Sequence, residues 1–168
     1  PGGAIGFLLD HMVGDSLNNM RILIAVMLIV MGVILYFVDK ICSSDTEYED
    51  MNFNQTFIIG LSQALAFIPG VSRSGITMTA GRIMGVSRKA VAKYSFMLST
   101  PIALGATLYK LKDFSFDFAF IVGVVTSAVT GILVIKFLLD YLKKGSLKIF
   151  AIYRVVLGCL VILLKHID

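Results

Sequence analysis

Long apolar runs separated by short polar segments dominate the chain. Three runs cover residues 22–38, 118–139 and 147–164, and a fourth, interrupted by Pro101, covers residues 88–109. Each comes close to the roughly 20 residues that an α-helix needs to cross the hydrocarbon of a bilayer. The pattern predicts an all-α polytopic membrane protein with transmembrane helices at these four positions.

A further apolar segment, residues 57–84, differs because Pro69-Gly70 interrupts it. This pair stops a helix, and residues 57–68 alone are too short to span a membrane. We therefore expect a re-entrant hairpin with one short helix over residues 57–68, a turn over residues 71–75 and a second helix from residue 76 to about residue 84. Irregular backbone at membrane depth persists only where protein or a water-filled cavity covers it, so such a turn is typical of a functional site.

Composition and charge agree with a membrane location. The chain is 57% hydrophobic, against roughly 45–50% in soluble domains, and its mean hydropathy is +0.87. The net charge of +4 comes from basic residues between the apolar runs, mainly in segments 82–93 and 143–148. The positive-inside rule places these two segments in the cytoplasm and makes nucleic-acid binding an unnecessary explanation. Cys42, in a polar loop, and Cys159, in an apolar run, are expected to be free thiols.

The first residues, Pro1-Gly2-Gly3, include neither an initiator methionine nor the basic start of a signal peptide. We expect the sequence to be the C-terminal part of a longer protein, with further helices upstream. A site assembled from two halves of that protein would be represented here only in part.

The turn in segment 69–77 carries the strongest chemical signal. Two hydroxyls, a guanidinium and two glycines precede a helix in an otherwise apolar setting, and free N–H groups at a helix start attract anions. An arginine adds a planar fork that binds phosphate oxygens in bidentate fashion. The alternative is that a serine only caps the helix while the arginine reaches the lipid headgroups. We favour a phosphate site and assign substrate binding to Gly70, Ser72, Arg73, Ser74, Gly75 and Thr77, with Arg73 and Ser72 as the catalytic candidates.

Structural explanations are preferred for the remaining candidates. Arg154 is a charge inside the last apolar run, which normally faces a cavity or a partner; pairing or snorkelling is favoured over a direct role. Small residues four apart indicate close helix packing, Ser87 is a helix cap, and the Tyr94-Ser95-Phe96 segment is expected to pack. The small residues are the pair Gly81 and Gly85 and the series Gly123, Ser127 and Gly131. Neither His11 nor His166 can be argued from the sequence to be a general base.

The segment 69–77, Pro-Gly-Val-Ser-Arg-Ser-Gly-Ile-Thr, resembles the signature of the undecaprenyl-pyrophosphate phosphatases, also called bacitracin-resistance proteins. Gly81, Gly85, the Ser87-Arg88 pair and Pro101 continue the likeness, which extends over nearly the whole chain. The resemblance implies a hydrolase of the bacterial inner membrane that converts undecaprenyl pyrophosphate to undecaprenyl phosphate and inorganic phosphate, recycling the carrier lipid for peptidoglycan synthesis. It also implies two inverted repeats, each with a re-entrant hairpin.

The same resemblance implies a divalent cation, Mg²⁺ or Ca²⁺, whose glutamate ligands lie outside this sequence, as would the base or nucleophile. The acidic residues at 45–50 are interpreted as a solvated loop. The expected partners are a polyprenyl pyrophosphate lipid and the membrane, without nucleic acid; assembly as a homodimer stays open. The competing hypothesis is a lipid or anion transporter, because helix starts aimed at an anion also serve transport.

Overall fold

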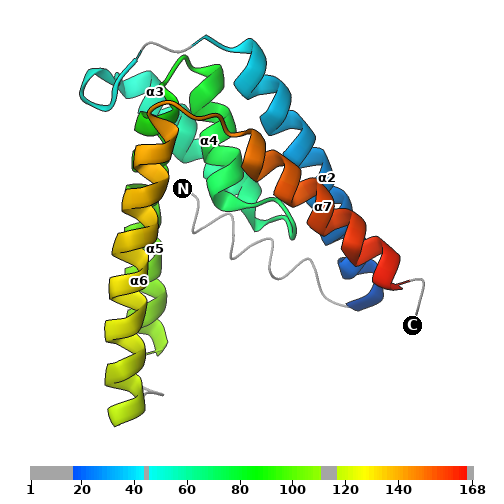
Figure 1. Ribbon diagram of the computed structural model, residues 1–168, viewed down its shortest axis with the longest axis vertical. Coiled ribbons are helices and arrows are strands. Elements are labelled where there is room, and N and C mark those ends of the chain that lie inside the picture. The colour runs from blue at the N-terminus through cyan, green and yellow to red at the C-terminus, as the bar shows by residue number, and fades with distance from the viewer. Residues whose placement is uncertain (1–16, 44–45, 111–116, 166–168) are drawn as a thin grey trace.

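A computed structural model describes residues 17–43, 46–110 and 117–165 (Figure 1). The long helices are α2 (Leu17–Ile41), α5 (Arg88–Lys110), α6 (Phe118–Leu142) and α7 (Lys148–Lys165). The short helices are α3 (Phe53–Ser62) and α4 (Arg73–Ile83), with 3₁₀ turns η1 (Tyr48–Asp50) and η2 (Gln63–Phe67). Within the described ranges there is no β-strand, and Thr46 and Val86 form an isolated β-bridge. The all-α prediction is confirmed.

The four long helices lie at the four predicted spans. Two stretches, Met20–Ile41 and Phe118–Leu142, are long and apolar enough to cross a membrane. The first is partly buried in the protein, whereas the second is largely exposed, as a helix in contact with lipid would be, and only its last residue, Leu142, lies in the core. Membrane crossing by α5 and α7, and a kink at Pro101 inside α5, stay predictions.

Two helix pairs diverge from one end of the molecule. α2 packs along α7 in one pair and α5 along α6 in the other, while α4 contacts both α2 and α5 and so lies between the pairs (Figure 1). The buried core forms where the pairs meet, because its members come from the adjoining helix ends and from the hairpin. These members are Leu35, Ile59, Met78, Val86, Ala90, Val91, Ala92, Leu142 and Leu147.

Helix α3 and helix α4 pack against each other on either side of the Pro69-Gly70 turn, with bounds that differ from the prediction. The first helix begins at Phe53, where Asn52 and Gln55 form a reciprocal capping box, and it tightens to 3₁₀ geometry from Gln63. Gly70 has a φ of 90°, which favours glycine and allows the reversal of the chain. The second helix begins at Arg73, so the prediction of a start at residue 76 is wrong by three residues. The depth of this hairpin in a membrane stays a prediction.

Asp39 joins four helices at the end where the pairs meet. This buried carboxylate accepts from Arg82 Nε at 3.1 Å and from Arg88 Nε at 2.7 Å. Its second oxygen accepts from the backbone N–H of Leu147 at 3.0 Å. Arg82 also donates to the carbonyl of Cys42 at 2.7 Å. Unlike a solvated cytoplasmic charge, Arg82 is therefore fully buried and paired.

Several predictions for small residues have different outcomes. A β-carbon on Gly81 would collide with Val91, so close packing is confirmed there. Gly85 instead has a φ of 79° and open space around it. The prediction that Gly85 serves close helix packing is therefore wrong. Ser87 caps α5 by accepting from the N–H of Ala90, as predicted. In the described part of the chain nothing lies within 4 Å of a β-carbon on Gly123 or Gly131. Both cysteines are free, as predicted.

Candidate anion site at the start of helix α4

The site begins with the cap of α4. Ser72 has a non-helical backbone, with φ −54° and ψ 126°, and its hydroxyl accepts from the N–H of Gly75 at 3.4 Å, which makes Ser72 the N-cap. The hydroxyls of Ser72 and Ser74 lie 3.3 Å apart. The predicted turn residues Arg73, Ser74 and Gly75 thus form the first turn of the helix. Their position brings the free N–H groups and the positive dipole end of α4 to the motif.

A guanidinium from the far end of the sequence completes this cluster. Arg154 on α7 donates from Nη2 to the Ser72 hydroxyl at 2.8 Å. Its side chain is buried, with 8% exposure, and Nη1 is a buried donor with no hydrogen-bond partner in the described part of the chain. Such an orphan donor is rare in a folded protein, and this N–H has the capacity to donate to a ligand.

Gly75 makes room for this guanidinium. A β-carbon at position 75 would coincide with the Nη1, Cζ and Nη2 atoms of Arg154. Any residue with a side chain would therefore push Arg154 away from Ser72. The second glycine of the motif serves the close contact of two elements, α4 and α7.

Arg73, in contrast, is exposed. Its side chain makes no hydrogen bond or ion pair with any described residue. The guanidinium that contacts Ser72 is therefore Arg154, for which the sequence analysis favours pairing or snorkelling. One sequence signal could have identified Arg154: a charge inside an apolar run normally faces a cavity or a partner.

Thr77 is buried one turn further along α4. Its hydroxyl lies 2.7 Å from that of Ser95 on α5 and is also close to the backbone carbonyl of Arg73. Within the described residues it contacts neither Ser72 nor Arg154. Thr77 and Ser95 thus hold α4 against α5, and Ser95 packs, as predicted, through this polar contact. The two histidines considered as possible general bases, His11 and His166, lie outside the described residues.

The donor set suits an anion. It combines one buried cation, two hydroxyls and the positive end of a helix, and all of these favour phosphate oxygens. It does not suit a divalent cation, which requires carboxylate or carbonyl oxygens. The described residues also contain no group of three histidine, cysteine, aspartate or glutamate side chains that could hold a metal ion. The expectation of Mg²⁺ or Ca²⁺ places its ligands outside this sequence and stays a prediction.

Comparison with known proteins agrees with the motif. Residues 1–160 match the family model described as "Bacitracin resistance protein BacA". The chain is 47% identical to an undecaprenyl-diphosphatase of Pelotomaculum thermopropionicum over 98% of its length and 63% of the relative's. It is 44% identical to an undecaprenyl-diphosphatase of Moorella thermoacetica over 96% of its length and 63% of the relative's. The chain thus spans less than two thirds of the length of each of these two relatives. The family match covers nearly all of the sequence, and the chain belongs to the bacitracin resistance protein BacA family.

Proposed function

We propose that the protein hydrolyses undecaprenyl pyrophosphate to undecaprenyl phosphate and inorganic phosphate in the bacterial inner membrane, as a multi-pass enzyme. The observation that carries this proposal is the contact of buried Arg154 with the Ser72 cap, which leaves a guanidinium N–H unpaired at the start of a helix. Both relatives are named undecaprenyl-diphosphatases, and the proposed substrate is taken from that name. The recycled phosphate lipid would serve peptidoglycan synthesis.

The cluster is suited to binding the pyrophosphate and stabilising charge. Arg154 is held by the protein and offers a fixed guanidinium, whereas exposed Arg73 is free to turn toward a ligand. Two guanidiniums and the N-terminus of α4 would neutralise the phosphoryl oxygens as charge shifts during transfer. Preorganised donors of this kind each contribute about 10²–10³-fold in rate.

In the proposed reaction the oxygen of a nucleophile bonds to the terminal phosphorus, and the anhydride P–O bond to the lipid phosphate breaks. The electron pair of that bond leaves with the oxygen of undecaprenyl phosphate. When water attacks, its proton passes to a base. The described partners of the Ser72 cluster are hydroxyls, backbone groups and a guanidinium, so we place the base outside the cluster. Ser72 binds substrate in this scheme.

The test measures phosphate release from undecaprenyl pyrophosphate by the full-length protein in detergent. We expect Arg154→Ala to lower kcat/KM about 10²–10³-fold, because a charged donor to the transition state is removed. Arg73→Ala should also lower kcat/KM strongly. Arg154→Lys should rescue little, since an ammonium lacks the planar fork.

Arg21→Ala is the matched control, because Arg21 is an exposed arginine on α2; it should retain activity. Full activity of a folded Arg154→Ala variant would contradict the role given to this residue. Lipid movement across vesicles without any phosphate release by the unmutated protein would contradict the phosphatase and favour a transporter.

A further inference from the structure

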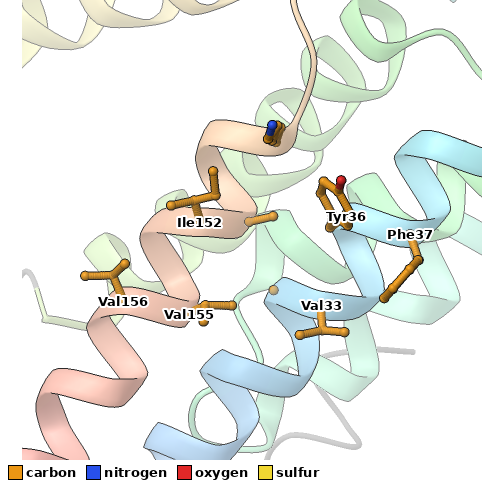
Figure 2. A pocket seen from close by; sticks show the side chains of 9 residues that line it. Val33, Tyr36, Phe37, Ile152, Val155 and Val156 are labelled. Atoms are coloured by element: carbon orange, nitrogen blue, oxygen red, sulfur yellow. The ribbon is translucent and has the colours of Figure 1, made fainter.

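A shallow apolar groove runs between α2 and α7. Its volume is about 340 Å³. Figure 2 shows Val33, Tyr36 and Phe37 of α2 and Ile152, Val155 and Val156 of α7 along it. The residues that line the groove do not include Ser72, Ser74 or Arg154.

A polar hollow lies beside one end of the groove. This second cavity, of about 330 Å³, is lined by Tyr36, Asp39, Lys40, Arg88, Ser146 and Lys148. Tyr36 and Lys148 line both cavities, so the two are neighbours. In Figure 2 the Tyr36 hydroxyl points along the groove toward the end at which α7 begins.

The lysines of this hollow continue the groove-facing stripe of each helix. Lys40 follows Val33 and Tyr36 at a spacing of four to seven residues, and Lys148 precedes Ile152 by four, spacings that keep residues on one face. Arg88 and Asp39 pair with each other. Lys40 and Lys148 are exposed, and neither makes an ion pair with a described residue. Two positive charges are thus available where the apolar groove ends.

We propose that this groove and hollow bind an anionic phospholipid. One acyl chain lies in the groove between α2 and α7, and the phosphate lies between Lys40 and Lys148. The order of the site, an apolar channel followed by two unpaired cations, matches the order of tail and phosphate in such a lipid. Basic pockets between membrane helices bind lipid headgroups by this combination of charge and apolar contact. The site is separate from the one that would bind pyrophosphate.

The first test measures lipid binding to the full-length protein by native mass spectrometry in detergent, with phosphatidylglycerol or phosphatidylcholine added. Phosphatidylglycerol should bind at least about tenfold more tightly, because each nearby lysine favours an anionic headgroup. The double variant Lys40→Gln with Lys148→Gln should lose this preference. The control, Lys143→Gln with Lys144→Gln, removes the same charge from the same end and should keep it.

The second test addresses the groove itself. Ile152→Trp should weaken phosphatidylglycerol binding about tenfold by filling the groove, whereas Ile149→Trp, exposed on α7 outside the groove, should not. Equal binding of both lipids, unaffected by the lysine changes, would overturn the proposal. A dimer that Ile152→Trp converts to a monomer would assign the groove to a second copy of the chain. An Ile152→Cys thiol that stays unreactive in delipidated monomer would assign it to another segment of the protein. Either result would also overturn the proposal.

Discussion

At the scale of single residues, Gly75 and Arg154 depend on each other. The guanidinium occupies the space that any side chain at position 75 would fill, and this places Nη2 within 2.8 Å of the Ser72 hydroxyl. A glycine near a helix start is usually explained by backbone freedom. Here the N–H of Gly75 lies in a regular first turn, so the close approach of a side chain from α7 is the stronger reason for it.

We expect Gly75→Ala to lower phosphate release by at least about tenfold while leaving the helices intact. The added methyl displaces Arg154 from Ser72, and overpacking of this kind costs about 1–3 kcal/mol. Phosphate release and the thermal midpoint in detergent measure the two effects. Gly60→Ala is the control, because nothing lies within 4 Å of a β-carbon there. Equal activity of both variants would show that the position of Arg154 does not limit the reaction.

At the scale of elements, Asp39 holds the helix ends together. Its carboxylate pairs with arginines at the end of α4 and the start of α5, and it fixes the N–H of Leu147 just before α7. This is a buried polar network in which charges and backbone groups satisfy one another. Removing Asp39 leaves the buried guanidinium of Arg82 without its counter-charge. The packing of the two helix pairs therefore depends on this residue.

Asp39→Asn should destabilise the protein by about 3–5 kcal/mol, because buried Arg82 would lose its counter-charge. Asp140→Asn offers a matched control. Asp140 makes an exposed ion pair with Lys143, and such a pair contributes less than about 1 kcal/mol. Thermal unfolding in detergent compares the two. Similar small shifts for both variants would mean that the network at Asp39 is not a main source of stability.

At the scale of the whole molecule, the structure collects the basic loops at one end. The ends of α2, α4 and α6 and the starts of α5 and α7 all meet there (Figure 1). The positive-inside rule then assigns this end to the cytoplasm. The end of α5 and the start of α6 lie at the opposite end of this helix pair (Figure 1).

Cysteine labelling tests this orientation. In a Cys42→Ser, Cys159→Ser background, Phe118→Cys should react with a membrane-impermeant maleimide in intact spheroplasts. Lys144→Cys, at the basic end, should react only after lysis. Both side chains are exposed, so access should depend on the side of the membrane. The reverse pattern would contradict the predicted topology.

The sequence alone determined the helical class, the approximate positions of the long helices, the break at Pro69-Gly70 and the family to which its motif belongs. These features depend on local information: run length, helix breakers and the order of residues in one turn. It placed the start of α4 three residues too late, because the turn was extended to Gly75 and the cap at Ser72 was only the less favoured alternative.

Only the tertiary structure decided which side chains meet. Arg154 lies 82 residues from Ser72 in the chain, and Leu147 lies 108 residues from Asp39. No local pattern encodes these contacts, because they depend on how α7 packs against α2 and α4. For the same reason the motif's own Arg73 is exposed, while Arg154, for which no partner could be named from the sequence, contacts the Ser72 hydroxyl.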